Sequence, residues 1–161
     1  MTHPFLRLTL LGFLTLLLAT PVHAADEINV AKGATHAGTG LAVRGYDVVA
    51  YFTTGEPVIG LEKFAVSHKG GTYRFASQAN LDAFKADPAK YEPAFGGFCA
   101  YGVALGKKFD GDPNFWKIVN GKLYLNLDGD IQAEWAKDTA GNITKADGNW
   151  GRIRAVAVDK L

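Results

Sequence analysis

Short hydrophobic runs separated by glycine-containing turns predict two antiparallel hairpins. The first has arms at 64–67 and 72–76, joined by a turn that contains Gly70-Gly71. The second lies at 117–127, where Asn120-Gly121 stands between two β-rich arms. Asn-Gly is a strong short-range hairpin signal because both residues tolerate a positive φ. We therefore expect a hairpin at each place.

Each hairpin is followed by a pattern that predicts a short helix. Ser77 and Asp128 suit the N-cap position, because their side-chain oxygens accept hydrogen bonds from free N–H groups of a first turn. Asp87-Pro88 ends the first pattern, since proline cannot continue a helix. The apolar positions at helical spacing are Leu81, Phe84, Ile131 and Trp135.

Three other segments have weaker patterns. The apolar run at 48–52 predicts a strand, and 93–105, with its small and aromatic residues, suits a buried helix or a turn followed by a helix. The sequence after Gly141 has no strong period. No internal repeat and no linker are visible, which indicates one α+β domain of small antiparallel hairpins packed with short helices.

The N-terminus has the pattern of a cleaved secretory signal peptide. Arg7 precedes an apolar stretch at 8–19, and Val22-His23-Ala24 follows as an A-x-A-like end. We therefore expect a periplasmic or secreted protein that has no membrane anchor after cleavage, the alternatives being an uncleaved anchor or a buried core helix. The expected organisation is a signal peptide at 1–24, an irregular segment at 25–40, the folded domain at 41–150 and a C-terminal tail at 151–161.

The charge balance argues against one class of partner. The chain has 17 Lys and Arg residues against 16 Asp and Glu residues, and no run of basic residues. A phosphate backbone is recognised by a basic patch or stripe. Nucleic-acid binding is therefore not expected.

Cys99 is the only cysteine of the chain. In an exported protein such a residue forms an intermolecular disulfide, packs as an inert buried thiol, or reacts as a free thiol. If Gly96-Gly97 open a helix at residue 98, Cys99 lies in the first turn, where the helix dipole lowers the pKa of a thiol. A thiolate of that kind is a nucleophile or a metal ligand.

Few other soft-metal ligands remain once the signal peptide is removed. The mature chain has no methionine, and His36 and His68 are its only histidines. Each also suits a solvated position, His68 beside a glycine turn and His36 in a Gly/Thr-rich segment. A metal site would combine Cys99 with His68 and His36. The candidate oxygen ligands are Asp47, Asp110 and Asp112.

Residues 73–84 (YRFASQANLDAF) and 87–91 (DPAKY) resemble the YHS domain, and 45–52 (GYDVVAYF) fits its first strand. That small module occurs beside metal-transporting ATPases and in some oxygenases, and it is usually presumed to bind metal. The resemblance extends to an exported bacterial branch of standalone YHS proteins. These continue with segments like 96–101, 112–126 and 141–150, so the resemblance covers about 41–150.

The chain departs from the metal-associated YHS pattern at all three of that pattern's cysteines. The corresponding positions are Ala50, Ala76 and Asn80. Because soft-metal coordination needs thiolate sulfur, the resemblance implies the fold but not that ligand set. Related exported proteins keep a cysteine at the position of Cys99, which implies redox or metal chemistry there.

Three functional hypotheses follow. The first is a non-enzymatic module that binds or handles a metal ion, copper or zinc, through Cys99 with His68 and His36. The second is a thiol redox protein in which a small oxidant oxidises Cys99 and an external reductant, such as an exported protein partner, restores it. The third is an interaction module in which Cys99 is an inert core residue.

Overall fold

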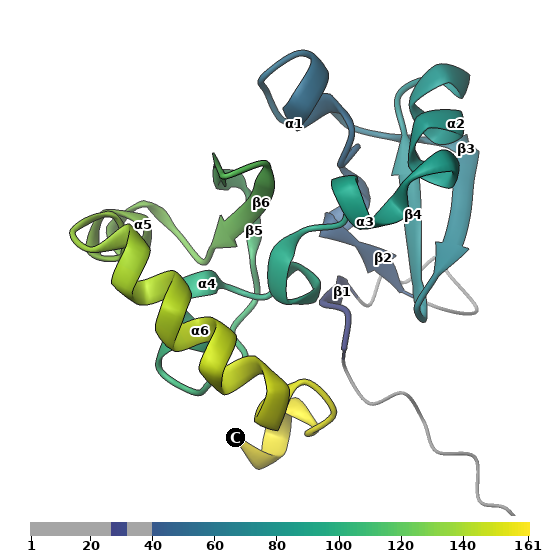
Figure 1. The fold of residues 1–161 in the computed structure, drawn as a ribbon. Helices are drawn as coiled ribbons and strands as arrows, with labels where there is room; N and C mark the ends of the chain where they lie inside the picture. Colours follow the sequence, from purple (N-terminus) through teal and green to yellow (C-terminus); the bar gives the residue numbers. More distant parts are fainter. Residues whose placement is uncertain (1–26, 32–39) are drawn as a thin grey trace, which may run out of the picture.

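The computed structural model of the protein describes residues 27–31 and 40–161 (Figure 1). The expected signal peptide and His36 lie outside the described residues. Helices and small sheets are both present, which confirms the α+β class. No helix in the described part of the chain is long and apolar enough to cross a membrane. The elements are β1 Val30–Ala31, β2 Leu41–Ala42, η1 Val43–Gly45, α1 Ala50–Thr53, β3 Leu61–His68, β4 Gly71–Phe75, α2 Gln78–Ala86, α3 Pro88–Tyr91, η2 Ala94–Gly97, α4 Ala100–Ala104, β5 Asp112–Val119, β6 Lys122–Asn126, α5 Gly129–Ala136, α6 Thr139–Ile153 and η3 Val158–Lys160.

Two sheets organise the core. The larger has the order β1-β2-β4-β3, with β2 parallel to β4 and the other pairs antiparallel. The smaller is the β5-β6 hairpin. Along β6, Leu123 and Leu125 pack into the core of the larger sheet, whereas Tyr124 packs into a second core with Trp135. The second hairpin therefore lies between two cores and contributes one face to each.

Both predicted hairpins and both predicted helix caps are confirmed. The turns Lys69-Gly70 and Asn120-Gly121 have positive φ at both central residues, as a two-residue type I′ turn requires. Ser77 and Asp128 each accept a hydrogen bond from the backbone N–H three residues later, at 3.1 and 2.8 Å. Local turn and cap chemistry therefore determines these elements.

The strand expected at 48–52 is wrong, because this segment runs into the short helix α1. The Asp47 carboxylate accepts N–H bonds from Val49 at 2.8 Å and Ala50 at 3.3 Å, which turns the chain into a helix. Val48, Val49 and Tyr51 are almost completely buried. The apolar run thus reflects burial on all sides rather than a strand.

The longest helix of the described residues, α6, is not expected from the sequence pattern. Gly141, Gly148 and Gly151 lower its intrinsic helix propensity. Asp138 caps its first turn, and its apolar residues, spaced three and four apart, pack into the second core. Those residues are Ile143, Ala146, Trp150 and Ile153. Tertiary packing therefore stabilises this helix, and the domain boundary expected at residue 150 falls inside it.

An internal repeat is present, so the expectation of no repeat is wrong. Strands β3 and β5 begin at residues 61 and 112, 51 positions apart, and β4 and β6 begin at 71 and 122. The two hairpins have the same strand lengths and the same register shift near the start of the first strand. The following helices begin at 78 and 129, and then at 88 and 139. Backbone geometry thus repeats where side chains have diverged.

The segments before the hairpins repeat as well, 52 positions apart. Residues 43–45 and 95–97 all have positive φ. After these turns, Asp47 N–H donates to the Val58 carbonyl at 2.8 Å, and Cys99 N–H donates to the Phe109 carbonyl at 2.9 Å. Asp47 and Cys99 therefore occupy equivalent positions. We call residues 43–91 unit 1 and residues 95–153 unit 2.

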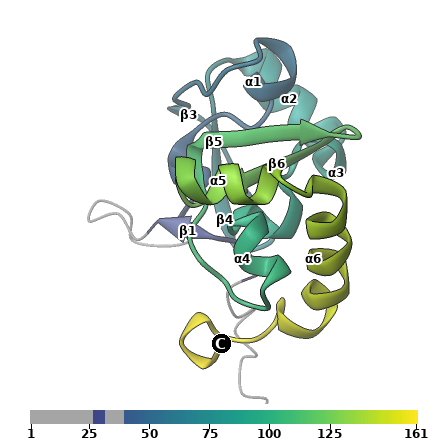
Figure 2. The same cartoon turned by 90° about the vertical axis from the view of Figure 1, so that its left-hand side faces the viewer.

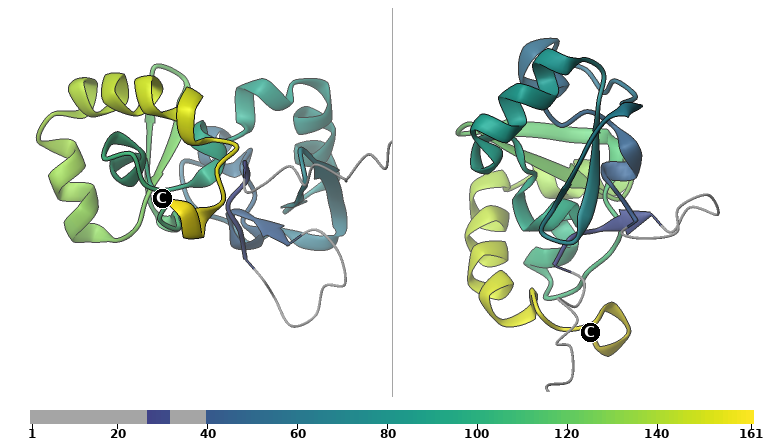
Figure 3. Two further views of the ribbon diagram at one scale, coloured as in Figure 1. Left: turned by 90° about the horizontal axis from the view of Figure 1, so that it is seen from below. Right: turned by 90° about the vertical axis from the view of Figure 1, so that its right-hand side faces the viewer.

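The units lie side by side (Figure 3, left) and differ most in their last helix. Helix α3 of unit 1 has 4 residues, whereas its counterpart α6 in unit 2 has 15. Figure 2 shows α6 along the flank of unit 2. Strands β1 and β2 flank unit 1 and extend its sheet.

Candidate functional site

Cys99 is fully buried at the start of α4, inside unit 2. It is the N-cap residue, because α4 begins at Ala100, so its expected place in a first turn is wrong. Its Sγ accepts the Gly102 N–H at 3.4 Å and lies 3.8 Å from Oδ1 of Asn126. A protonated thiol satisfies both contacts, since it donates to the amide oxygen and accepts from the backbone.

Burial raises the pKa of the Cys99 thiol above its ordinary value, although the backbone N–H groups of Gly102, Leu127 and Tyr101 oppose this rise. The expected lowering of the thiol pKa is therefore wrong. Removal from water disfavours the charged thiolate more than these donors favour it. Cys99 accordingly has the environment of a neutral core thiol.

His68 lies in unit 1 and is half-buried rather than exposed. Its Nε2 is 3.1 Å from a carboxylate oxygen of Glu92, and its ring packs edge-on against Tyr73 and Phe84. These contacts hold His68 in the first core, whereas Cys99 belongs to unit 2.

The candidate oxygen ligands are also engaged elsewhere. Asn29 donates to Asp110 at 2.6 Å, and Arg44 pairs with Asp112 at 2.7 Å. Within residues 27–31 and 40–161, no three His, Cys, Asp or Glu side chains are grouped to hold a metal ion. The ligand set of Cys99, His68 and His36 stays a prediction, because His36 lies outside the described residues.

The positions of the three missing YHS cysteines converge on Asp47, which is fully buried. Its carboxylate accepts N–H bonds from Val49, Ala50 and Ala76, the last at 2.8 Å, and a 2.6 Å bond from the Asn80 side chain. Two alanine methyl groups and an amide donor offer no soft-metal ligand, and the four donors occupy the carboxylate. A metal held by the family's cysteine positions does not fit this chain.

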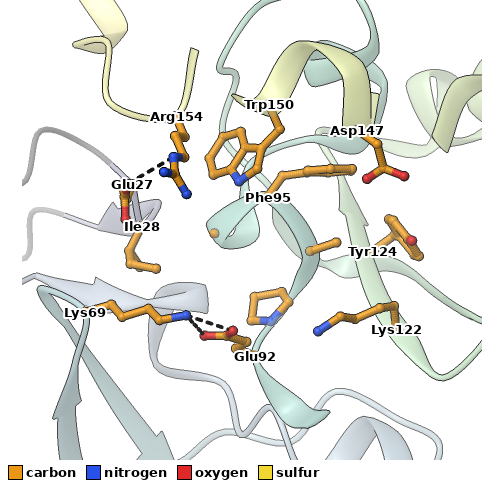
Figure 4. Close-up of a pocket in the computed structure, with 13 residues that line it drawn as sticks. Glu27, Ile28, Lys69, Glu92, Phe95, Lys122, Tyr124, Asp147, Trp150 and Arg154 are labelled. Carbon is orange, nitrogen blue, oxygen red and sulfur yellow. Dashed lines mark hydrogen bonds and ion pairs between the residues drawn. The ribbon is translucent and has the colours of Figure 1, made fainter. Parts of the chain in front are cut away.

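A pocket of about 430 Å³ lies where the two units meet (Figure 4). Its walls come from residues 27–28, the β3-β4 turn, the segment 92–96, strand β6 and helix α6. We call it the junction pocket. Its larger side chains are Lys69, Glu92, Phe95, Lys122, Tyr124, Asp147, Trp150 and Arg154.

Three aromatic rings form one wall of the junction pocket. The Phe95 ring centroid is 5.8 Å from that of Trp150 and 5.9 Å from that of Tyr124. Phe95 has a φ of 54°, and Val43 has a φ of 49° at the equivalent position of unit 1. The left-handed turn is thus a property of the repeat, and in unit 2 it directs a large ring toward α6.

Charged side chains surround these rings, and most of them pair within the wall. Lys69 contacts both Glu92 oxygens at 2.9 Å, and Arg154 lies 3.7 Å from Glu27. Although burial opposes ionisation, the hydrogen bonds and charges of Lys69 and His68 hold the pKa of Glu92 below its ordinary value. Burial, with the nearby Asp147 charge, raises the pKa of Tyr124.

Sequence reasoning did not find the junction pocket. Trp150 and Tyr124 have the sequence signal of core residues, and Asp147 and Lys122 that of solvated surface residues. They meet because the long helix α6 packs against α4 and brings Asp147 and Trp150 to the same pocket as β6. The glycines of α6 weaken the helical pattern of its sequence. The Asn120-Gly121 turn was the available signal, since it fixes Lys122 and Tyr124 at the start of β6.

Comparison with known proteins bears on unit 1. No curated protein and no solved structure matches the chain. Residues 49–94 match the family model of the YHS domain, a family associated with metal binding, and this segment covers most of unit 1. The chain therefore contains a YHS domain at residues 49–94.

Proposed function

We propose that the protein is a non-enzymatic binding module that takes a small ligand into the junction pocket. The observation that carries this proposal is the pocket itself, a cavity of about 430 Å³ with an aromatic wall and a charged rim. Ligand sites of about 300–1,000 Å³ with a few directed polar groups are typical of small-molecule binding.

The unequal lengths of the repeated helices support this site. Residues 139–142 of α6 correspond to the whole of α3, and the rest of α6 is an addition in unit 2. Asp147 and Trp150 lie in that addition and line the pocket, and so does Arg154, the residue that follows the helix. The part of unit 2 that unit 1 lacks is thus the part that forms a pocket wall.

The chemistry of the lining favours binding over catalysis. Among the described residues that line the pocket there is no Ser, Thr, Cys or His side chain. Hydrogen bonds from Lys69 and His68 and the charge of Lys69 lower the pKa of Glu92, and burial moves the pKa of Tyr124 further above neutral pH. These groups suit fixed charge and hydrogen-bond recognition rather than proton transfer.

Thermal-shift measurements on the full chain would test the proposal. The panel would contain amino acids, sugars, nucleotides and organic acids, and each compound that raises Tm would then be followed by amide NMR. We expect the perturbed amides to include Glu92, Lys122, Asp147 and Trp150. A panel in which no compound perturbs these amides would overturn the proposal.

Metal handling through Cys99 is the second candidate, because the YHS family is associated with metal binding. The backbone N–H groups of Gly102, Leu127 and Tyr101 point at the sulfur and would favour a thiolate if the site opened. The proposed ligands are Cys99 with His68 and His36, and the proposed ion is copper or zinc. Both metal binding and the thiol redox alternative require access to the sulfur of Cys99, which is buried.

Anaerobic titration of Cu(I) and Zn(II) against a chromophoric chelator would test this second candidate, with Cys99→Ser beside the wild type. Tight stoichiometric binding that is lost in the variant would support metal handling. Equal binding, or none, in both proteins would rule out Cys99 as the ligand. Circular dichroism would verify that the variant is folded.

We also propose that the module works outside the cytoplasm, in the periplasm or as a secreted protein. The support is the signal-like order of basic, apolar and small residues before Ala25. Mass spectrometry of the protein purified from its native host would test this. A mature chain beginning at Ala25 is expected, and an intact Met1 would contradict it.

A further inference from the structure

The charges of the junction pocket are not all neutralised by one another. Lys69 pairs with Glu92, and Arg154 with Glu27. Lys122 donates to the Ala89 carbonyl at 2.6 Å but has no carboxylate partner among the described residues. Asp147 is exposed and has no hydrogen bond or ion pair within the same part of the chain. Among the described residues, Lys122 and Asp147 are thus the charges of the pocket that have no oppositely charged partner.

The two unneutralised charges lie on one side of the pocket, with Tyr124 between them (Figure 4). Lys122 and Tyr124 come from strand β6, and Asp147 comes from helix α6. The paired residues Arg154, Glu27 and Lys69 lie on the opposite side. A ligand that satisfied both free charges would need an anionic group near Lys122 and a cationic group near Asp147.

The rings of Phe95 and Trp150 indicate which chemical groups the uncharged part of the ligand contains. Phe95 is buried, and Trp150 is only partly buried where it lines the pocket. Aromatic faces favour apolar or aromatic partners, and an ammonium group gains a further cation–π attraction. The cavity of about 430 Å³ is at the small end of the usual range for ligand sites. A compact molecule therefore fits better than a nucleotide.

We infer that the junction pocket binds a zwitterionic amino acid with an aromatic or large apolar side chain. This inference rests on the proposed function and names its ligand class. The carboxylate pairs with Lys122, the ammonium group pairs with Asp147, and the side chain packs against Phe95 and Trp150. In each charged contact, a charge-assisted hydrogen bond at a partly desolvated surface replaces the hydration of the charged group.

Isothermal titration calorimetry of the full chain with four compounds would test the inference. L-phenylalanine has both charges and a ring, phenylethylamine lacks the carboxylate, phenylpropionate lacks the amine, and glycine lacks the ring. We expect L-phenylalanine to bind most tightly, and each of the other three to bind at least about tenfold more weakly.

Charge-removing variants would assign the two contacts. Asp147→Asn should weaken L-phenylalanine binding about tenfold and leave phenylpropionate unchanged, whereas Lys122→Gln should weaken both. The matched controls are Asp130→Asn and Lys117→Gln, exposed charges of unit 2 that do not line the pocket. These controls should change neither affinity.

The failures of the inference and of the proposed function are distinguishable. Equal affinity for L-phenylalanine and a singly charged analogue, or unchanged affinity in both pocket variants, would overturn the assignment of a zwitterionic ligand. If none of the four compounds binds but another panel compound perturbs the pocket amides, only the ligand class is wrong. If no compound perturbs those amides, both are wrong.

Discussion

The two units place different groups at the same buried position. In unit 1 it is Asp47, whose carboxylate accepts four hydrogen bonds, and in unit 2 it is Cys99, whose thiol faces backbone N–H groups and the Asn126 oxygen. Both side chains are fully buried at the start of a short helix. Both also receive the backbone N–H that follows the second strand of the hairpin, from Ala76 and Leu127 respectively.

The difference shows how one backbone framework accommodates a charge or a neutral group. A buried carboxylate is tolerated only when donors replace its lost hydration. Unit 1 supplies an extra donor from Asn80, whereas in unit 2 the nearby Asn126 presents its oxygen, and its Nδ2 has no hydrogen-bond partner among the described residues. Unit 1 is therefore built around an anion and unit 2 around a neutral thiol.

The largest expected effect is the loss of the Asp47 carboxylate. Asp47→Ala should lower the free energy of unfolding by about 3–5 kcal/mol, because several buried donors, each worth about 1–3 kcal/mol, lose their acceptor. Urea denaturation would measure it. The control is Asp130→Ala, an exposed residue in the first turn of α5, with an expected cost under about 0.5 kcal/mol. Similar costs for both variants would contradict the role of Asp47 as the centre of unit 1.

A smaller effect is expected when unit 2 is given the residue of unit 1. Cys99→Asp should fold with a loss of about 1–2 kcal/mol, because the backbone donors at Gly102 and Leu127 remain and Asn126 can turn its unpartnered amide toward the new carboxylate.

Cys99→Leu is the comparison variant for this exchange, since it is apolar but too large for the site. If the N–H groups around Cys99 do not form an anion cradle, Cys99→Asp will unfold the protein while Cys99→Leu remains folded. Circular dichroism and urea denaturation of both variants would decide.

Turn and cap chemistry made much of the fold predictable from the sequence. Gly70, Asn120 and Gly121 supplied positive φ at the turns, and Ser77 and Asp128 supplied caps, because each of these effects depends on a few adjacent residues. Helix α6 was not predictable, since its stability comes from packing of Trp150 and Ile153 in the second core. Local propensity carries no information about such contacts.

The repeat and the candidate site could be predicted only in part. Repeated backbone geometry is maintained by unlike residues, such as Asp47 and Cys99 or Phe84 and Trp135, so the sequence did not reveal it. Cys99 was recognised as chemically distinct, but its pKa is raised by burial, and that burial depends on packing against residues far along the chain, such as Asn126. The junction pocket requires the position of α6 and was therefore not predictable.

A further difference concerns acid sensitivity, which we expect at Glu92, the residue that follows unit 1 and pairs with His68 and Lys69 of that unit. The pKa of Glu92 is lowered in the folded state, so its ionisation stabilises the fold above the unfolded pKa. That contribution is lost as pH falls through the lower, folded pKa. Glu92→Gln should reduce the acid-induced loss of stability, by less than about 1 kcal/mol because Lys69 is half exposed. Glu134→Gln, which removes the carboxylate of an exposed pair with Lys137, is the control, and the effect of Glu92→Gln should exceed its effect. A pH profile of unfolding that Glu92→Gln does not alter would contradict this assignment.

The smallest expected effect concerns the two hairpin turns, which have Lys69 and Asn120 at the same left-handed position. Asparagine tolerates this conformation better than lysine. In unit 1, however, the Nζ of Lys69 contacts both Glu92 oxygens at 2.9 Å. Asn120→Lys should therefore cost about 0.5 kcal/mol, because unit 2 offers no such carboxylate at its turn among the described residues. Lys69→Asn should be nearly neutral, since the better turn residue offsets the lost ion pair. Urea denaturation of both variants would measure the difference, and a stabilising Asn120→Lys would show that the two turns are not equivalent.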